Sequence, residues 1–494
     1  MKALRFALKN PPHVPAVADH SPLDGLARRR LGIVDAVSQS VGAIAPTAGV
    51  ATMPALVAAA AGPGTALSVL LATALITLVS STISQFARRL AVAGSLYSYA
   101  AQAYKPFPAL LTGAALLIGY SFVAMFAMAG AGIFAANWVL HLIPVPGPTA
   151  VSVAACTLAV AAFSFFVMRQ GVRVSSRTTL AVECASVLLV LVLVMILLAK
   201  QGVQHVNVFN LAGATPSGIA SGTVLALMAF VGFESATVLG AETRSPLKTL
   251  PRALLWTVLA TGLFFLLTTY TQLAGFGWQD QALAASTTPF VDLATGTGIP
   301  GLLSLLDAAI TLSFVACALA SVTALSRVLF TMGREGVLPA WFGDVHPRSG
   351  TPLRAITVVL PVTVAVPHSF LLAGFTPWAV MNTLITAAAA GFITAYIFLC
   401  LALPLFLHRI GEITAVPVVI ALVTGLMLIS AFALFLTRTF ENGYGAGGVA
   451  FLLAMALVSL LFFLRRRPVT AGLPGPGVYD TPTKRNLLGG KGEG

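Results

Sequence analysis

Twelve long apolar runs dominate this 494-residue sequence and restrict what it can fold into. A membrane-spanning helix needs about 20 consecutive apolar residues. The runs cover residues 33–61, 65–86, 108–141, 149–168, 178–199, 217–240, 253–274, 299–332, 354–372, 377–406, 414–436 and 446–464. Because they are continuous and do not alternate over about 10 residues, they exclude a strand barrel. We therefore predict an all-α integral membrane protein with 12 transmembrane helices.

The composition excludes a soluble protein. Apolar residues make up 58% of the chain and charged residues only 9%, whereas soluble domains carry about 25% charged residues. The four cysteines and seven histidines are scattered along the sequence, with no spacing typical of a metal site or a disulfide framework. We therefore expect no cofactor and no metal.

The net charge of +13 raises the question of a nucleic-acid partner, and the positions of the charges answer it. If residues 1–30 form a cytoplasmic tail, all of the 28 Lys and Arg residues except Lys200 and Arg438 fall on the inner side. This is the asymmetry that orients membrane proteins. We expect a multi-pass protein of the inner (plasma) membrane with both termini cytoplasmic, a disordered tail over 465–494, the lipid bilayer as its partner, and no nucleic acid.

Two of the runs are interrupted by helix-breaking residues. The first run holds Gly42, Pro46 and Gly49, and the sixth holds Gly232 directly before Phe233. Proline removes a helical hydrogen bond, and glycine adopts backbone angles that a helix forbids. Inside a membrane such breaks are tolerated where they are buried in protein or line a cavity. The alternative is that each break is only a kink that helps helices to pack.

The two breaks occupy matching positions in two blocks of five helices, 31–200 and 217–406. Paired breaks of this kind are the best sequence indicator of a transporter's binding site at the membrane midplane. Because five is an odd number, the second block is inverted relative to the first. Helices over 414–464 fall outside this five-plus-five inverted repeat, which has discontinuous helices 1 and 6.

Four acidic residues lie at membrane depth, where an acid is costly and functional by default. Glu234 stands at the second break and is a candidate for proton coupling or for capping unwound backbone amides. Glu183 is a candidate for proton exchange or for an ion pair with Arg177. Asp35 fits a gate salt bridge or a helix N-terminal charge, and Asp307 fits a buried hydrogen bond.

Polar and aromatic residues near the breaks supply further candidates. Ser313, Ser321 and Thr323 are candidates for binding sodium or lining the pathway, with backbone hydrogen bonding as the alternative. Phe230 and Phe233 are candidates for closing over a substrate, with simple packing as the alternative.

Four stretches resemble the amino acid–polyamine–organocation transporter superfamily. They are the first run, AVAGSLYSYAAQAYKP (91–106), FVGFESATVLGAETRSPLKTLPRA (230–253) and ASVTALSRVLFTMGREGVLP (320–339). The resemblance covers about residues 30–465 and implies the five-plus-five fold with two extra helices. It also implies secondary transport of amino acids or related amines, by proton symport or by exchange.

The resemblance also implies where a substrate binds. Aligned through Pro54, the family's Gly-Ser-Gly motif, whose amides take the substrate carboxylate, falls on Thr47, Ala48 and Gly49. Two of its three positions therefore differ, although a helix N-terminus still binds an anion. The position of a span 5 lysine found in some members falls on Ser186. The remaining implied substrate-site residues are Gly42, Ala45, Pro46, Met228, Phe230, Gly232 and Phe233.

These features together predict a permease, not an enzyme, that works by alternating access. Its expected partners are a small amino acid or amine and a coupling H+ or Na+. A sodium-coupled symporter of another organic solute, an ion channel and a membrane enzyme are the alternatives. The sequence lacks a channel's selectivity-filter pattern and a nucleophile–base cluster within the runs.

Overall fold

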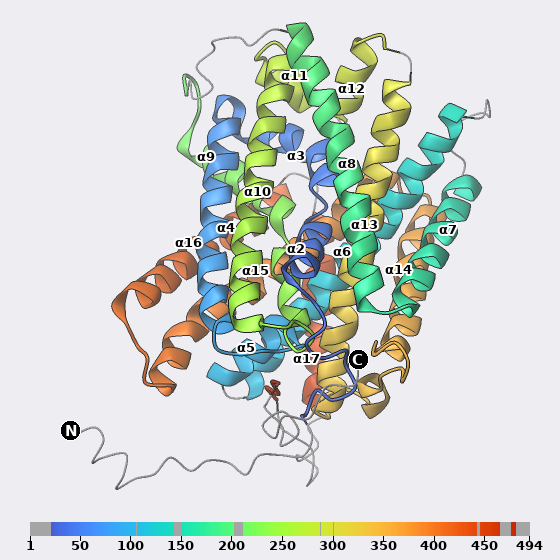
Figure 1. Ribbon diagram of the computed structural model, residues 1–494. Helices are drawn as coiled ribbons and strands as arrows, with labels where there is room; N and C mark the ends of the chain where they lie inside the picture. The colour runs from blue at the N-terminus through green and yellow to red at the C-terminus, as the bar shows by residue number, and fades with distance from the viewer. Residues whose placement is uncertain are drawn as a thin grey trace, which may run out of the picture.

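The computed structural model describes residues 21–104, 106–142, 150–201, 211–286, 288–299, 301–441, 445–464 and 476–480. Its regular structure in these ranges is helical, with one isolated bridge between Leu31 and Thr243. Figure 1 shows the long helices running roughly along one axis, as expected for a bundle that crosses a bilayer.

In the described part of the chain, ten long helices form most of the bundle. They are α4 (Thr65–Ala87), α6 (Pro106–Leu142), α7 (Ala150–Arg169), α8 (Val172–Gln201), α10 (Pro246–Gly275), α13 (Leu302–Arg334), α14 (Leu353–Leu372), α15 (Pro377–Arg409), α16 (Ala415–Glu441) and α17 (Gly445–Leu464). Two interrupted segments lie among them. The first consists of α2 (Ile33–Ile44) and α3 (Pro46–Ala61), and the second of α9 (Pro216–Leu227), η2 (Met228–Phe230) and η3 (Phe233–Leu239).

Short helices join these elements. They are η1 (Gly62–Gly64), α5 (Ser95–Ala103), α11 (Asp280–Ala285), α12 (Pro289–Gly296) and η4 (Ala340–Gly343). In the described residues, 11 stretches of helix are long and apolar enough to cross a membrane. Helix is present in each of the 12 ranges expected from the sequence. In the first of these ranges, however, α2 has 12 residues and α3 has 16, so neither is long enough by itself to cross a membrane. The all-helical membrane fold is confirmed, while the count of 12 spans, the inverted repeat and the domain boundaries stay predictions.

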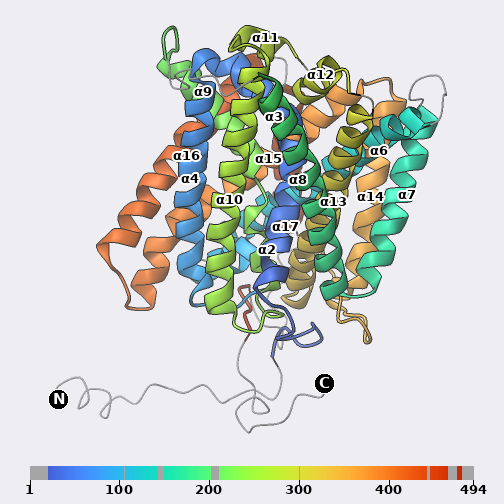
Figure 2. The same ribbon diagram turned by 45° about the horizontal axis from the view of Figure 1, so that its top comes forward.

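Helices α6, α13 and α15 form the centre of the bundle, and glycines allow their close approach. A Cβ on Gly130 of α6 would lie 2.5 Å from the Phe314 ring of α13. A Cβ on Gly391 of α15 would lie 2.7 Å from the Ala115 carbonyl of α6. Small residues at such crossings let membrane helices pack tightly where no hydrophobic effect drives them together. The outer helices instead present large apolar side chains, such as Leu426 of α16, which is 66% exposed, and Figure 2 shows α16 and α7 at opposite edges.

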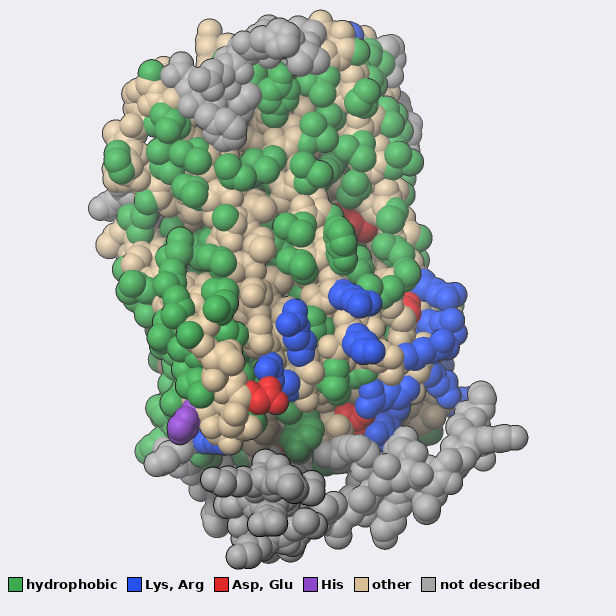
Figure 3. Space-filling model, turned by 60° about the vertical axis from the view of Figure 1, so that its left-hand side comes forward, with side chains coloured by type: hydrophobic (Ala, Val, Ile, Leu, Met, Phe, Trp, Pro, Cys, Tyr) green, Lys and Arg blue, Asp and Glu red, His purple; other side chains and the backbone are tan. Residues whose placement is uncertain are grey.

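Basic side chains gather at one end of the molecule (Figure 3). Exposed basic residues at this end are Arg30, Arg88, Arg173, Arg177, Arg244, Lys248 and Arg252. Arg30 precedes α2 and Arg88 follows α4, while the others lie at or just before the starts of α8 and α10. We call this end of the bundle the basic end. The distribution is the one that the positive-inside rule describes, while the orientation in the membrane stays a prediction.

Candidate functional site

The first interruption lies at Ala45, between α2 and α3. Ala45 has φ 51° and ψ 65°, a left-handed conformation that costs an L-residue about 1–2 kcal/mol. Its N–H donates to the Val41 carbonyl at 3.0 Å, and Pro46 begins α3 without an N–H to continue the helix. The C-terminus of α2 and the N-terminus of α3 therefore meet inside the bundle, each with polar backbone groups that have no partner within their own helix.

The second interruption lies at Val231 and Gly232, between η2 and η3. Gly232 has φ +92°, and a Cβ there would lie 3.2 Å from both the Cβ and the carbonyl oxygen of Ala43. The two interruptions are therefore in contact. Hydroxyl groups join them, since Ser40 donates to the Phe233 carbonyl at 2.5 Å and Ser235 donates to the Gln39 carbonyl at 2.9 Å.

A cavity of about 70 Å³ lies where the two interruptions meet, and we call it the central cavity. Among the described residues its lining is almost wholly apolar and holds no charged side chain. The two interrupted segments contribute Ala43, Ile44, Ala45, Ala48, Gly49, Met53, Leu56, Leu225, Met228, Ala229 and Val231. The surrounding helices contribute Val123, Phe126, Cys317, Trp378, Met381, Asn382 and Ile385.

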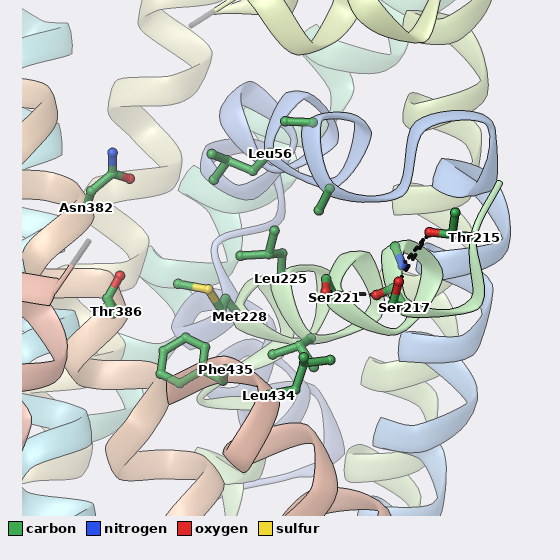
Figure 4. A pocket seen from close by; sticks show the side chains of 14 residues that line it. Leu56, Thr215, Ser217, Ser221, Leu225, Met228, Asn382, Thr386, Leu434 and Phe435 are labelled. Atoms are coloured by element: carbon green, nitrogen blue, oxygen red, sulfur yellow. Dashed lines mark hydrogen bonds between the residues drawn. The ribbon is translucent and has the colours of Figure 1, made fainter. Parts of the chain in front are cut away.

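A larger cavity of about 410 Å³, which we call the vestibule, adjoins the central cavity (Figure 4). The two share Leu56, Leu225, Met228 and Asn382. The vestibule reaches the start of α9 at Thr215 and Ser217 and the last part of α16 at Leu434 and Phe435. Both lie away from the basic end, so the central cavity communicates with the opposite end of the molecule.

The basic end is closed by polar contacts. Arg327 of α13 forms a buried two-point ion pair with Glu242, with Nε–Oε2 and Nη2–Oε1 distances of 2.7 and 3.2 Å. The N–H groups of Arg30 and Leu31 donate to the Glu242 carbonyl at 2.8 and 2.9 Å. The segment before α2 is thus joined to the segment after η3, directly below the two interruptions.

The C-terminal segment 476–480 adds to this closure. Asp480 is buried and forms ion pairs with Arg28 at 2.5 Å and Arg29 at 2.8 Å. The N–H groups of Gly477 and Val478 each donate to Glu335 Oε1 at 2.8 Å, and Tyr97 donates to Oε2. Burial raises the pKa of the Glu335 carboxyl to about 7, although these hydrogen bonds oppose the shift.

Asp35 lies in the first turn of α2 and links it to α8. Its Oδ2 accepts a hydrogen bond from the Gly32 N–H at 2.9 Å, and its Oδ1 accepts one from the Ser176 hydroxyl at 3.0 Å. A carboxylate at a helix N-terminus is stabilised by the helix dipole. Asp35 thus occupies the position of a helix N-terminal charge and forms no salt bridge in the described part of the chain, while its role in gating stays a prediction.

Glu234 is fully buried between three segments. Its Oε1 accepts a hydrogen bond from Tyr120 of α6 at 2.7 Å, and its Oε2 accepts one from Tyr396 of α15 at 2.5 Å. The carboxyl does not line the central cavity. Sequence reasoning missed both tyrosines, because a single hydroxyl inside a long apolar run does not reveal its partner.

Glu183 lies beside the N-terminus of α3. It is 1% exposed, and its Oε1 accepts a hydrogen bond from the Ser313 hydroxyl at 3.0 Å. The backbone N–H of Thr47 interacts with the same carboxyl. Arg177 is exposed and forms no ion pair with Glu183 in the described residues. The two lie six positions apart on α8, which puts them on different faces of a helix with 3.6 residues per turn.

The amides at the start of α3 have partners inside the protein. The Ala48 N–H donates to the Ser313 hydroxyl at 3.3 Å, and the Gly49 N–H donates to the Ala45 carbonyl at 3.0 Å. The Thr47 N–H interacts with the Glu183 carboxyl, as described above. The backbone N–H groups of all three positions that the resemblance implies for carboxylate binding therefore already have partners in the protein. A bound anion would therefore share or replace these contacts.

The candidate hydroxyls of α13 do not form one cluster. The Ser313 hydroxyl donates to Glu183, whereas the Ser321 hydroxyl lies 3.8 Å from the Cys317 thiol. The Thr323 carbonyl oxygen accepts a hydrogen bond from Arg327 Nη1 at 3.2 Å. Ser186 donates to the Ala309 carbonyl at 2.8 Å. Among the described residues no group of three or more His, Cys, Asp or Glu side chains is placed to hold a metal.

The aromatic candidates pack behind the cavity wall. Phe230 contacts Phe265 with ring centroids 4.9 Å apart, and Phe233 contacts Tyr396 at 5.6 Å. Neither lines the central cavity, whereas Met228, the other bulky candidate of this segment, does. Trp378 and Phe126, from α15 and α6, are the aromatic side chains that line it, and the sequence reasoning named neither.

Comparison with known proteins agrees with this architecture. The model of the amino acid permease family matches residues 35–467. An uncharacterized transporter of Rhizobium meliloti is 27% identical over 50% of this chain, and the match spans only 52% of that relative. A branched-chain amino acid permease of Lactococcus lactis is 27% identical over 76% of this chain and 82% of its own length.

A further relative is the chloroplastic cationic amino acid transporter 9 of Arabidopsis thaliana, which is 26% identical over 70% of this chain and 62% of its own length. These three relatives are named as transporters or permeases. The family match covers nearly the whole membrane part, including both helix interruptions and the cavity between them. The chain therefore belongs to the amino acid permease family and is a multi-pass membrane protein of the amino acid–polyamine–organocation superfamily.

Proposed function

We propose that this protein carries amino acids across the plasma membrane by alternating access, with the substrate bound in the central cavity. The observation that carries this proposal is the contact between two helix interruptions around one cavity. Irregular backbone at membrane depth is retained where it lines a site. The N-terminus of α3 offers positive helix-end polarity to a carboxylate, and the C-terminus of α2 offers carbonyls to an ammonium group.

We infer that the preferred substrates are aliphatic amino acids. The cavity wall is formed by Val123, Phe126, Val231 and Trp378, with no acid to balance a cationic side chain. A charge buried without a partner is unfavourable by several kcal/mol, so lysine or arginine would be rejected. The Lactococcus relative carries a name that fits this inference, whereas the Arabidopsis name refers to cationic substrates.

The arrangement of the two cavities supports an order of events. We place the basic end in the cytoplasm, so the vestibule faces outward and the inner side is closed by the Arg327–Glu242 pair. Glu234, which joins α6 and α15 through Tyr120 and Tyr396, holds the same side together. Inward opening requires these contacts to separate, and the substrate drives the change only through unequal affinity for the two states.

Uptake into proteoliposomes tests the proposal. Purified protein should accumulate radiolabelled leucine, and unlabelled isoleucine and valine should compete at micromolar to millimolar concentration, while arginine should not. Liposomes without protein provide the background. Stronger inhibition by arginine than by isoleucine would overturn the aliphatic assignment, and no exchange of any amino acid would overturn the transport proposal itself.

A further inference from the structure

A buried carboxyl group and the N-terminus of a half-helix meet behind the central cavity. Glu183 of α8 is 1% exposed, and its Oε1 accepts a hydrogen bond from Ser313 of α13. Its Oε2 has no hydrogen-bond partner in the described part of the chain, and the same holds for the buried hydroxyl of Thr47. Buried polar atoms without partners are rare and call for an explanation.

Among the residues that the structure describes, no side chain supplies a countercharge to this carboxyl. Its electrostatic neighbours are two thiols, Cys184 on its own helix and Cys317 on α13. Asp35 of α2 is engaged with Gly32 and Ser176. In the described residues no Lys, Arg or His of α2, α3, α7, α10 or α13 pairs with Glu183. The positive end of α3 is therefore the charge partner of this acid.

We propose that Glu183 is the residue that couples proton movement to substrate movement, by taking up a proton when a substrate carboxylate reaches the N-terminus of α3. This inference rests on the proposed function. Both carboxylates use the same half-helix end, because Thr47 and Ala48 contact Glu183 and Ser313 while Ala48 also lines the central cavity. Two carboxylates at one site do not both stay ionised.

Thermodynamic linkage turns this repulsion into coupling. If a bound substrate carboxylate raises the proton affinity of Glu183, a proton on Glu183 raises the affinity for the substrate by the same factor. The proton comes from solvent and forms an O–H bond at the unpartnered Oε2. It makes this atom a hydrogen-bond donor at a carboxyl that the Thr47 backbone contacts, and the Thr47 hydroxyl is also without a partner in the described part of the chain. It returns to solvent when the substrate leaves on the other side.

A proton fits this position better than a sodium ion. The three side-chain oxygens of Glu183, Thr47 and Ser313 resemble a cation site by composition. However, Glu183 and Ser313 contact backbone N–H groups at the positive end of a 16-residue helix, which opposes a metal cation. Protonation instead neutralises the carboxylate and releases this helix end for the substrate.

The test compares wild-type protein with Glu183→Gln and with Asp307→Asn, which removes a different buried acid. Wild type and Asp307→Asn should bind leucine about tenfold more tightly at pH 6 than at pH 8, and a pH gradient should drive accumulation. Glu183→Gln should show the same affinity at both pH values and lose gradient-driven accumulation, yet still exchange internal for external leucine. Accumulation by Glu183→Gln at the wild-type level, or a sodium requirement at fixed pH, would overturn the proposal.

Two further measurements keep the outcomes distinct. In weakly buffered solution, leucine binding should take up about one proton per leucine in wild type and none in Glu183→Gln. If Glu183→Gln does not fold, Glu183→Asp should keep the proton uptake and shift its midpoint, and an unchanged midpoint would overturn the assignment. A wild-type protein that exchanges no leucine in any buffer refutes the proposed function, whereas pH-independent exchange by wild type refutes only the coupling role.

Discussion

Replacing Gly232 by alanine tests whether the second helix interruption has the geometry described. The backbone there has φ +92°, where an L-residue costs about 1–2 kcal/mol. The new Cβ would also lie 3.2 Å from two atoms of Ala43, so one interruption must move away from the other. Overpacking of this kind costs about 1–3 kcal/mol. The two effects together predict a loss of about 2–5 kcal/mol of folding stability.

Gly49→Ala is the matched control, since Gly49 lies at the other interruption. Its Cβ would meet the Phe265 ring at 3.4 Å and the Ala229 Cβ at 3.6 Å, which is ordinary contact. Alanine also favours a helix over glycine by about 0.8–1.0 kcal/mol. We expect Gly232→Ala to melt several degrees below wild type and to lose leucine uptake, and Gly49→Ala to melt at or above wild type. Equal melting temperatures for the two variants would refute the geometry of the second interruption.

Three other predictions concern the basic end. Glu242→Gln leaves Arg327 buried without its partner, so the melting temperature should fall by the equivalent of about 3–5 kcal/mol; a fall no larger than that of an exposed Glu412→Gln variant would contradict this. Because the pKa of Glu335 is raised to about 7, its protonated form favours folding, and stability should decline as pH rises from 5 to 7 and level off above 7. Glu335→Gln should remove this decline, which melting curves at pH 5, 6, 7 and 8 measure, and an identical pH profile would count against it. Asp480→Asn weakens two ion pairs to the N-terminal segment, so limited proteolysis near residue 28 should become faster than in wild type, and an unchanged rate would contradict the docking of the C-terminal segment.

Local chemistry explains which parts of the fold the sequence predicts. Long apolar runs define helices because their length matches the bilayer. Pro46 and Gly232 mark the interruptions because each acts on its own backbone. The left-handed conformation of Ala45 has no such signature, since alanine does not favour it. It exists because the surrounding packing over-determines it.

Long-range contacts explain what the sequence could not predict at the site. Glu234 was recognisable as a buried acid, but its partners Tyr120 and Tyr396 lie 114 and 162 positions away. Glu183 was recognisable too, but whether its carboxyl lies near Arg177 or beside the N-terminus of α3 depends on how α8 is rotated about its axis. The short 3-10 turn at Met228–Phe230 likewise decides that Met228 faces the cavity and Phe230 does not. Such rotations depend on tertiary packing and not on apolar length.

The central claim is that the cavity between the two interruptions holds the amino acid, and filling that cavity tests it most directly. Ala229 lines the 70 Å³ central cavity and is only partly buried, so Ala229→Phe places a ring where the substrate would bind. Val416→Phe, at a residue 69% exposed on the outer helix α16, controls for added bulk. We predict that leucine uptake by Ala229→Phe falls to the level of empty liposomes with little change in melting temperature, while Val416→Phe transports normally. Wild-type uptake by Ala229→Phe would contradict the claim.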